Sequence, residues 1–326
     1  MTRQTLTALA LAATTIATAS LLASKDSKPL FTVRAHDLHR IPKVIAYGDM
    51  RFTDPANIKA ANPRARRLLV DRIAEEAPDA VLLSGDVPWR GGMPDDYAQY
   101  QRETESWRGR QLRVFPALGN HEFSQCVESQ CLENWWTAFP ALRGHRWYSA
   151  RLGDAITLIA LDSDAPLVPG SDQYAWLTSE VKALPHSTRF VFIALHHPPV
   201  ADVQTRFQVD HNPRPNEIAL GEYLSAAAHT SRARFIVSAG HTHNYERFVQ
   251  DDVVYLVSGG GGAPPHPLDR TTPDLYQDTS FPNFHYVTFE LIGGVLKAQM
   301  VRLADPDADS PVWESKDAFD VQPKRR

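Results

Sequence analysis

Five short clusters in this chain place Asp, Asn or His beside glycine or proline at what reads as the end of a strand. They are Gly48-Asp49, Gly85-Asp86, Gly119-Asn120-His121-Glu122, His196-His197-Pro198-Pro199 and Gly240-His241-Thr242-His243. Glycine directly precedes the first potential ligand in four of the five clusters. Glycine at such a position allows the backbone to turn sharply and to approach another group closely. Five clusters in one context predict a common rim, where metal ligands from distant segments converge.

The ligand types indicate the chemistry of this rim. Carboxylate and imidazole groups suit Zn, Mn or Fe, and Asn supplies a neutral carbonyl oxygen. A mixed set of this kind can hold two ions about 4 Å apart, bridged by one carboxylate. Such ions neutralise phosphate oxygens and lower the pKa of a bridging water, which then attacks phosphorus in line. The clusters therefore predict a dinuclear phosphoesterase site with a metal-bridging hydroxide.

Apolar runs precede the clusters and would position them. They span residues 43–47, 80–83, 114–118, 190–195 and 235–239, and further strands are expected over 156–161, 253–257, 286–291 and 295–301. The last pair is separated by Ile292-Gly293-Gly294, a hairpin signal. Helical patterns alternate with these runs, over about 62–76, 96–107, 174–184 and 217–228. The alternation predicts an α/β protein with layered sheets and outer helices.

The motif order resembles that of the calcineurin-like metallophosphoesterases. Gly-Asp, Gly-Asp, Gly-Asn-His-Glu, His-x-Pro-Pro and Gly-His-x-His follow one another from Gly48 onward, and the resemblance extends to at least Gly262. The stretch Gly240 to Arg247 and the run Ser258-Gly259-Gly260-Gly261-Gly262-Ala263 are most similar to the purple acid phosphatase branch. The resemblance implies a four-layer α/β/β/α sandwich with two mixed β-sheets.

The resemblance also implies a role for each matching position. Asp86 would be the bridging carboxylate and a catalytic residue, and the other five metal ligands divide between two ions. Asp49 and His243 would hold the first metal, whereas Asn120, His196 and His241 would hold the second. His196 is preferred to His197 because the family's ligand precedes a proline by two positions, as His196 precedes Pro198. The two ions would be divalent or trivalent Fe, Mn or Zn, and the sequence leaves their identity open.

Two neighbours of the Asn complete this motif. His121 would reach the phosphate or protonate the leaving alcohol, so it is expected to bind substrate and to act in catalysis. Glu122 would orient a neighbouring group by hydrogen bonding.

Two positions depart from the family pattern, and both concern the first metal. Arg51 stands where many members carry a histidine ligand, and Trp89 stands where purple members use an iron-binding tyrosine. Indole cannot ligate a metal as phenolate does, so no tyrosinate–iron absorption band is expected. Arg51 is interpreted as a substrate-binding residue that clamps a phosphate oxygen. The alternative is a salt bridge from Arg51 to a carboxylate such as Asp54.

Composition limits the partners. The 326 residues are 43% hydrophobic and 22% charged, as in ordinary globular proteins, and the net charge is -4. A negative net charge argues against nucleic acid as a bulk partner. A small-molecule phosphate ester is the expected partner, and no obligate protein partner is evident.

The N-terminus and the cysteines indicate export. Residues 1–24 have a basic start and an uncharged apolar core, which predicts a signal peptide, with an uncleaved membrane anchor as the alternative. Cys126 and Cys131 would close a small loop in an oxidising compartment; two free thiols or a metal pair are the alternatives, although no further Cys is available for a thiolate site. The protein is thus expected to be periplasmic or secreted. Residues 25–39 are interpreted as a leader segment, 40–305 as the metallophosphoesterase domain, and 306–326 as a polar C-terminal tail.

The predicted function is an exported metal-dependent phosphoesterase, with monoesters as the first choice. One alternative is a phosphodiesterase or nucleotidase, and another is a non-catalytic metal- or phosphate-binding homologue with a weakened first metal site. Asp162 and Asp164 are expected to be solvated turn carboxylates, and the alternative is that they orient ligands. His211, His266 and His285 are interpreted as loop residues outside the site, with His266, beside the glycine run, as the alternative candidate to reach it.

Overall fold

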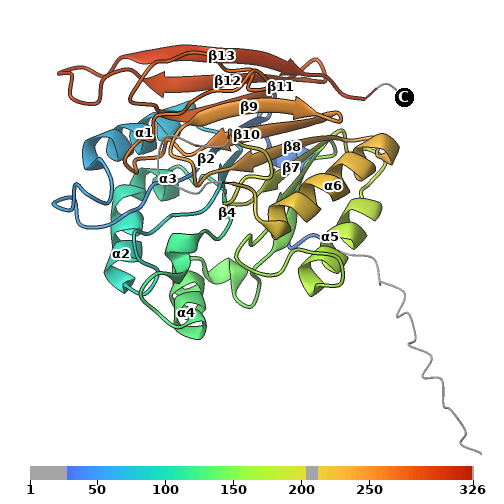
Figure 1. Cartoon of the computed structure of the whole chain (residues 1–326), viewed down its shortest axis with the longest axis horizontal. Coiled ribbons are helices and arrows are strands. Elements are labelled where there is room, and N and C mark those ends of the chain that lie inside the picture. Colours follow the sequence, from blue (N-terminus) through green and yellow to red (C-terminus); the bar gives the residue numbers. More distant parts are fainter. Residues whose placement is uncertain (1–27, 203–211, 325–326) are drawn as a thin grey trace, which may run out of the picture.

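The computed structural model describes residues 28–202 and 212–324, which form two β-sheets packed face to face between helices (Figure 1). The predicted signal peptide or anchor of residues 1–24 and His211 lie outside the described residues. In the part of the chain that is described, no helix is long and apolar enough to cross a membrane.

The first sheet has six strands and carries the N-terminal clusters of the predicted site. In spatial order the strands are β13 (Trp313–Val321), β12 (Val295–Leu303), β11 (Phe284–Ile292), β2 (Lys43–Tyr47), β3 (Ala80–Leu83) and β4 (Val114–Pro116). The strands β2, β3 and β4 are parallel to one another, whereas β11 to β13 form an antiparallel meander that pairs with β2 through β11. This sheet is therefore mixed, as predicted.

The second sheet has seven strands and carries the C-terminal clusters. Its order is β1 (Phe31–Val33), β5 (Tyr148–Leu152), β6 (Ile156–Ala160), β7 (Phe190–Ala194), β8 (Arg234–Ala239), β10 (Val253–Ser258) and β9 (Tyr245–Gln250). β6, β7, β8 and β10 are parallel, and antiparallel pairs occur at β5–β6 and β9–β10.

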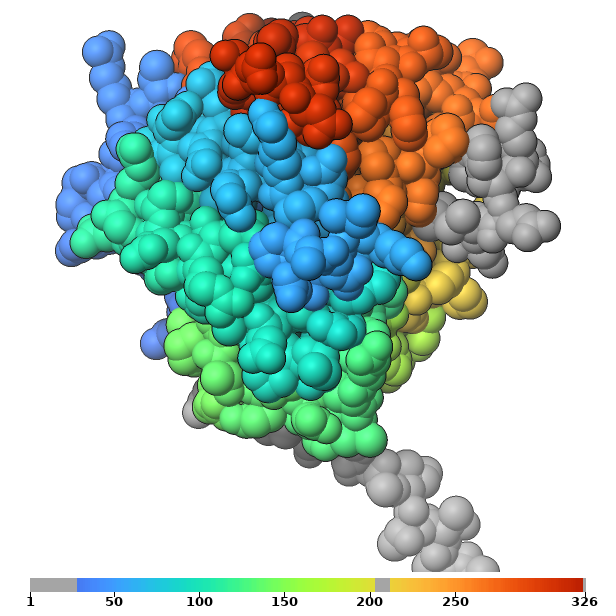
Figure 2. Space-filling model, turned by 90° about the vertical axis from the view of Figure 1, so that its left-hand side faces the viewer, coloured from blue at the N-terminus to red at the C-terminus, as the bar shows by residue number. Residues whose placement is uncertain are grey.

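The helices form the two outer layers. They are α1 (Pro63–Glu76), α2 (Pro94–Glu103), α3 (Glu105–Gly109), α4 (Glu128–Ala138), α5 (Asp172–Lys182) and α6 (Pro215–Thr230), with short 3-10 turns η1 (Ala35–Asp37), η2 (Asn120–Phe123) and η3 (Pro140–Leu142). α1 packs against β11 of the first sheet, and α6 packs against β8 and β10 of the second. Figure 2 shows the C-terminal residues in red, directly above the light blue atoms of the α1 region. The predicted four-layer sandwich is confirmed.

Strand β7 shows how the layers are held together. All five of its residues are buried, and successive side chains point to opposite faces of the sheet. Phe192 faces the first sheet, where its ring lies 4.9 Å from that of Phe289 in a T-shaped contact. Val191 and Ile193 belong to the second apolar cluster, with Leu220 of α6. A strand covered on both faces explains the continuous apolar run in the sequence.

The boundaries at both ends of the predicted domain need correction. Residues 25–39 contain β1, which pairs with β5, so part of the expected leader segment belongs to the second sheet. Residues 306–326 contain β13, which pairs with β12 along its length, so the expected polar tail contributes an edge strand to the first sheet. Only one face of β13 is covered, and its many charged residues gave no apolar run for a strand prediction.

The predicted helices and strands are otherwise found within a few residues of their expected positions. The expected helix over 96–107 is interrupted at Thr104 and divides into α2 and α3. The expected hairpin joins β11 to β12, and Gly293 and Gly294 both have positive φ angles, of 59° and 84°. A two-residue turn with two positive φ angles matches the twist of the paired strands, and glycine adopts it without steric cost. The strands β1, β5, β9 and β13 and the helix α4 were not predicted.

Candidate metal centre

The five clusters meet where the carboxyl ends of the parallel strands of both sheets face each other. Asp49 follows β2, Asp86 follows β3, and Asn120 opens the turn η2 after β4. His196 follows β7, and the segment after β8 carries His241 and His243. The backbone N–H of His241 donates to Asp49 Oδ2 at 2.9 Å, which ties the two groups of clusters together. The structure thus brings all six predicted metal ligands to one place.

The backbone at this rim adopts conformations that are uncommon for residues other than glycine. Asp49, Asp86 and His241 have φ angles of 63°, 55° and 69°. Such left-handed conformations persist where the surrounding structure holds them, and they often occur at functional sites. At Gly119 a Cβ atom would lie 2.6 Å from both the backbone nitrogen and Oδ1 of Asp86. Only glycine allows the Asn120 turn to approach Asp86 this closely.

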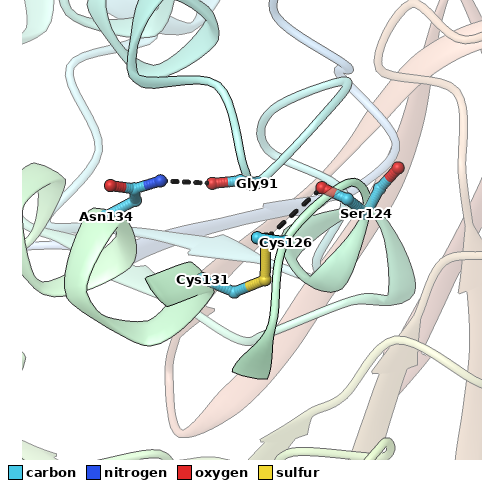
Figure 3. Close-up of a disulfide and its surroundings, with 5 residues drawn as sticks. All are labelled: Gly91, Ser124, Cys126, Cys131 and Asn134. Carbon is cyan, nitrogen blue, oxygen red and sulfur yellow. Dashed lines mark hydrogen bonds between the residues drawn. A yellow bond between two sulfur atoms is a disulfide. The ribbon is translucent and has the colours of Figure 1, made fainter. Parts of the chain in front are cut away.

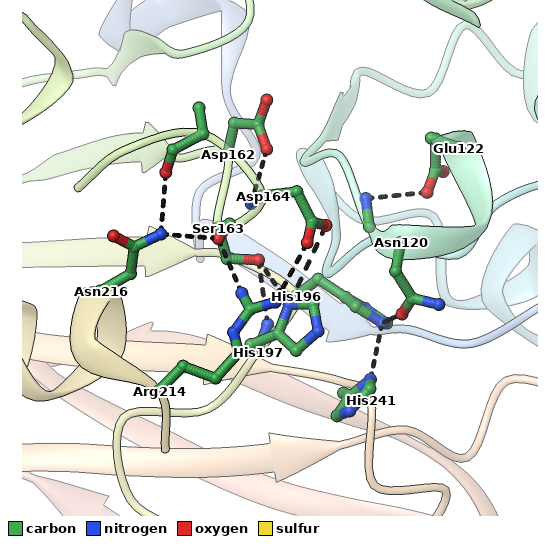
Figure 4. A network of polar contacts seen from close by, with 12 residues as sticks. Asn120, Glu122, Asp162, Ser163, Asp164, His196, His197, Arg214, Asn216 and His241 are labelled. Atoms are coloured by element: carbon green, nitrogen blue, oxygen red, sulfur yellow. Dashed lines mark hydrogen bonds and ion pairs between the residues drawn. The ribbon is translucent and has the colours of Figure 1, made fainter. Parts of the chain in front are cut away.

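His196 has the hydrogen-bonding pattern of a metal ligand. Its Nδ1 lies 2.9 Å from the Ser84 carbonyl oxygen, which can only accept, so Nδ1 carries the hydrogen. In the neutral ring Nε2 is then a bare lone pair. Nε2 lies 2.9 Å from Asn120 Oδ1 and 3.3 Å from Asp86 Oδ1, and Figure 4 shows His196, Asn120 and His241 converging. Three facing acceptors of this kind repel one another unless a cation or a proton lies between them.

His243 repeats this arrangement on the other side. Its Nδ1 lies 2.8 Å from the Pro264 carbonyl oxygen, so its Nε2 is also bare, and Nε2 lies 3.5 Å from Asp49 Oδ1. Both of these atoms are buried, and neither has a hydrogen-bond partner among the described residues. One ligand atom each from Asp49, Asp86 and His243 lies within 4.8 Å of the others. Buried polar atoms without partners are costly, and a bound cation would satisfy them.

Asp86 lies between the two sets of ligands and concentrates their charges. Its side chain is fully buried, and burial alone raises the pKa of its carboxyl group. The charges of His196, His121 and Arg51 outweigh this effect and hold the pKa of Asp86 well below its usual range. The same Asp86 charge, with that of Asp49, raises the pKa of the His196 imidazole against the opposing effect of burial. Asp86 is therefore ionised at any ordinary pH.

Arg51 contacts the expected bridging carboxylate. Its Nε and Nη2 atoms both lie 3.2 Å from Asp86 Oδ2, and its guanidinium carbon lies 5.2 Å from the centroid of the Trp89 ring. The expected alternative partner, Asp54, instead accepts a hydrogen bond from the backbone N–H of Ala56. The alternative of a salt bridge from Arg51 to a carboxylate is thus found, with Asp86 in place of Asp54.

His121 lies beside this pair and keeps one ring nitrogen free. Its Nδ1 donates to the Trp89 carbonyl oxygen at 2.6 Å, and its ring stacks on the Trp89 indole at a centroid distance of 4.5 Å. Its Nε2 lies 3.8 Å from Asp86 Oδ2. Burial lowers the pKa of His121, although the Asp86 charge opposes this. A partly exposed, neutral imidazole directed at the rim is suited to proton transfer.

Glu122 fixes the backbone around Asp86, in keeping with the orienting role expected for it. Its Oε2 accepts from the backbone N–H groups of Asp86 and Gly119, at 3.0 and 2.8 Å, and its Oε1 accepts from Val87 at 2.9 Å. Burial raises the pKa of Glu122 to about 8, and the Asp86 charge adds to the rise. The two turns that carry Asp86 and Asn120 are therefore joined through one carboxyl group.

His197 lies beside the ligands, with its ring centroid 4.2 Å from that of His241, but its Nδ1 faces a separate network (Figure 4). Its Nδ1 lies 2.8 Å from Ser163 Oγ. Arg214 bonds the Ser163 carbonyl oxygen at 2.7 Å and Asp164 Oδ1 at 3.1 Å. His196, and not His197, is thus the histidine that faces Asp86.

The expectation that Asp162 and Asp164 are solvated turn carboxylates is wrong for Asp162. Asp162 is fully buried, and its Oδ2 lies 2.7 Å from both Nε and Nη2 of Arg146. Asp164 is partly exposed and pairs with Arg214. The arginine partners lie far from both carboxylates in the sequence, so no local pattern indicated the pairing.

His266 lies against the site, which is the alternative considered for it. Its ring stacks on that of His243 at a centroid distance of 4.1 Å and an interplanar angle of 28°. His285 lies behind the glycine run, where its Nε2 accepts from Ser258 Oγ at 3.0 Å. The carbonyl groups of Ser84 and Pro264, which fix the two histidine tautomers, are site groups that the sequence did not indicate.

The two cysteines form a disulfide beside the site (Figure 3). Cys131 lies in α4 and Cys126 lies in the segment that follows η2, with their Cα atoms 5.6 Å apart. Asn134 of the same helix donates to the Gly91 carbonyl oxygen at 2.9 Å. Of the alternatives left open for the cysteines, the disulfide is the one found, and it anchors the turn that carries Asn120 and His121.

Comparisons with known proteins agree with this geometry. A family model described as calcineurin-like phosphoesterase matches residues 37–245, more than half of the chain. The chain therefore belongs to the calcineurin-like phosphoesterase family, and the predicted family is confirmed. A protein of Arabidopsis thaliana described as probable purple acid phosphatase 20 is 30% identical over 115 residues, which are 33% of this chain and 26% of that protein.

Solved structures of low sequence identity share the fold. The purple acid phosphatase PPD1 from yellow lupin (Lupinus luteus) seeds superposes with a TM-score of 0.68 at 17% identity, covering 90% of this chain and 55% of the lupin chain. A Plasmodium protein described as GAP50, the anchor in the inner membrane complex, has a TM-score of 0.61 at 12% identity, covering 88% of this chain and 90% of its own. The chain thus spans about half of the lupin protein, and the matched segment about a quarter of the Arabidopsis one.

Proposed function

We propose that this protein is an exported, metal-dependent phosphoesterase that hydrolyses phosphate esters, with monoesters as its preferred substrates. Family membership supports the reaction class. The observation that carries the proposal is the pair of imidazole Nε2 atoms on His196 and His243, each facing a carboxylate or amide oxygen while the Nδ1 of the same ring bonds a backbone carbonyl. Groups held in this way fit two cations on either side of Asp86.

The ligand set fits Fe, Mn or Zn. Asp49 and His243 would hold one ion, Asn120, His196 and His241 the other, and Asp86 would contact both. Two such ions supply Lewis-acid chemistry, because they neutralise phosphate oxygens and lower the pKa of water. The carbonyl oxygens of Ser84 and Pro264 keep the histidine tautomers ready for this role without rearrangement.

His121 and Arg51 would act on the substrate itself. In hydrolysis a water oxygen forms a bond to phosphorus while the ester P–O bond breaks, and the leaving oxygen takes up a proton. The Nε2 atom of His121 is placed to deliver that proton once it is charged. Arg51 would move its two N–H donors from Asp86 to a phosphate oxygen, since its guanidinium is partly exposed and both donors bond a single oxygen of Asp86.

A substrate screen tests this proposal. The purified chain is reconstituted with Mn, Zn or Fe and assayed with aryl phosphate monoesters, diesters and nucleotides. We expect monoester hydrolysis with two ions per chain, and loss of one ion in His196→Gln. His229→Gln changes an exposed histidine of α6 and is the matched control. Faster turnover of diesters or nucleotides would favour the phosphodiesterase or nucleotidase alternative.

A non-catalytic homologue is the second candidate. Arg51 pairs with Asp86 where other members carry a metal ligand, and this pairing favours a weakened first site. The fold is also shared with a protein described as an anchor. One ion or none per chain, together with no turnover across the substrate panel, would support this candidate and reject the enzyme.

Export is a separate part of the proposal. The composition of residues 1–24 favours a signal peptide, and a disulfide suits an oxidising compartment. The domain proposed for catalysis begins near residue 28 in place of 40, because β1 belongs to the second sheet. Cell fractionation with N-terminal sequencing tests export: a mature protein starting near residue 25 in the periplasm or medium supports it, and an intact N-terminus in a membrane fraction supports an anchor.

A further inference from the structure

A second group of buried carboxylates lies outside the candidate metal centre. Asp202, Glu246 of β9 and Asp274 of the loop between β10 and β11 come from three separate segments. Their side chains are at most 2% exposed. One carboxylate oxygen from each lies within 4.8 Å of the others. Three ionised carboxylates that lie this close together and are buried away from water repel one another strongly.

Two of the three carboxylates are held in place by donors from the surrounding loop. Asp202 accepts from the backbone N–H of Thr271 at 3.0 Å and from the hydroxyl group of the same residue. Asp274 accepts from the backbone N–H of Tyr276 at 2.9 Å and pairs with the Arg270 guanidinium at 2.5 Å. These contacts fix the positions of both carboxylates, but Arg270 supplies one positive charge against three negative ones.

Glu246 is the member whose bonding is incomplete. Its Oε2 accepts from the backbone N–H of Asp202 at 2.6 Å. Its Oε1 is fully buried and has no hydrogen-bond partner among the described residues. Burial raises the pKa of Glu246 to about 8, and the charges of Asp202 and Asp274 add to the rise. A buried carboxylate oxygen with no donor is costly, so this position calls for a positive partner.

We propose that Asp202, Glu246 and Asp274 bind a hard divalent cation, Ca²⁺ in the first place, at a site separate from the candidate metal centre. Oxygen ligands without imidazole or thiolate are the set that Ca²⁺ and Mg²⁺ prefer, whereas Zn favours nitrogen and sulfur. Once a cation displaces the proton from Glu246, the three carboxylates and Arg270 carry a net charge of about −2, which one divalent ion balances. Further ligands would come from water, as is common for Ca²⁺.

The site would tie the loop between β10 and β11 to β9. The same loop carries Pro264, whose carbonyl oxygen fixes the tautomer of His243, and Arg270, whose Nη1 also bonds the Tyr245 carbonyl oxygen at 2.8 Å. A cation held by Glu246 and Asp274 would therefore help to fix the loop whose Pro264 carbonyl group orients His243. Its role is structural, and it takes no part in the reaction.

Calcium binding to the full-length chain tests the proposal. Equilibrium dialysis of the chelator-treated protein should show one Ca²⁺ per chain with a Kd at or below about 1 mM. At tenfold excess over that Kd, the unfolding midpoint should rise by about 2 °C. In Glu246→Gln the Ca²⁺ affinity should fall by about tenfold or more, because the amide keeps the size of the side chain but loses its charge.

Glu222→Gln removes an exposed charge from α6 and is the matched control, which should bind Ca²⁺ as the unchanged protein does. Equal Ca²⁺ binding by Glu246→Gln would overturn the proposal. So would the absence of Ca²⁺ and Mg²⁺ binding by the unchanged chain, in which case a proton shared among the carboxyl groups would account for Glu246. Dialysis of the unchanged protein decides the matter even if the variant does not fold.

Discussion

The two halves of the candidate metal centre are built differently, although Asp86 belongs to both. In the second half, Asn120 and His241 converge on a single imidazole nitrogen of His196. In the first half, Asp49 Oδ1 and His243 Nε2 lie 3.5 Å apart, and both atoms lack hydrogen-bond partners among the described residues. The family departures, Arg51 and Trp89, also border the first half. If the proposed function is right, the two halves would therefore hold their ions with different ligand geometry.

Removal of the shared carboxylate charge should affect both halves and have the largest effect. In Asp86→Asn the side chain keeps its size, but both ions lose their common ligand, so kcat/KM for an aryl phosphate should fall by about 10³-fold or more. Steady-state kinetics and metal content per chain measure this. Asp154→Asn, an exposed change in a turn, is the control. Retention of two ions and near-normal turnover would contradict a bridging role.

Acidification should destabilise the folded protein near the first half of the candidate metal centre, because it protonates His285. The pKa of this buried histidine is lowered to about 4, chiefly by burial, from an ordinary value of 6.5. The unfolded chain therefore binds a proton between pH 6.5 and about 4 that the folded chain does not. Stability is fully present above pH 6.5 and should fall by about 3 kcal/mol as the pH drops to about 4.

His285 lies behind Ser258, whose carbonyl oxygen accepts from Gly48 directly before Asp49, so the loss should begin at the first half. Urea unfolding at pH 7 and pH 4.5, with His285→Gln as the comparison, measures it. The variant should lose less stability on acidification than the unchanged protein. The same pH dependence in both would show that His285 is not responsible.

Glu122 should hold the two halves of the candidate metal centre in position relative to each other. In Glu122→Gln an amide N–H₂ must face backbone N–H donors of Asp86, Val87 or Gly119, so the two turns can no longer be held as they are. Metal affinity should fall by about 10- to 100-fold, as is typical when a group that orients ligands is changed. Competition with a chelator measures the affinity, and Glu222→Gln serves as the control. An unchanged metal affinity would show that the two turns keep their conformation without the Glu122 contacts.

Arg51 should have the smallest of these effects, confined to substrate binding. In Arg51→Ala we expect KM to rise by about tenfold, with kcat and metal content nearly unchanged, because a guanidinium–phosphate contact is lost. Arg51→Lys should recover only part of the loss, since an ammonium group cannot bind in the bidentate mode. An unchanged KM with tighter metal binding would mean that Arg51 only pairs with Asp86.

The sequence predicted the strands that carry the ligands, because they are buried on both faces and read as continuous apolar runs, followed by glycine or, after β7, by the His196 to Pro199 cluster. β2, β3, β7 and β8 are of this kind. The edge strand β13 escaped prediction because its exposed side carries charged residues. The C-terminal end of the domain was drawn too narrowly for the same reason, and the N-terminal end because β1 has only three residues.

The site was predictable as far as it depends on side chains within motifs. The tautomers of His196 and His243 are set by the backbone carbonyl groups of Ser84 and Pro264. Every residue has such a group, so the residue type does not indicate which carbonyl will bond a histidine. The partner of Arg51 and the group formed by Asp202, Glu246 and Asp274 depend on contacts between distant segments. Such contacts follow from the packing of the two sheets and not from any local pattern.

A crystal structure of the metal-loaded protein, with anomalous scattering data, tests the central claim most directly. We predict two anomalous peaks on either side of Asp86, one near Asp49 and His243 and the other near Asn120, His196 and His241, with Arg51 moved away from Asp86 Oδ2. A single peak or none, with Arg51 still paired to Asp86, would contradict a dinuclear centre in this protein.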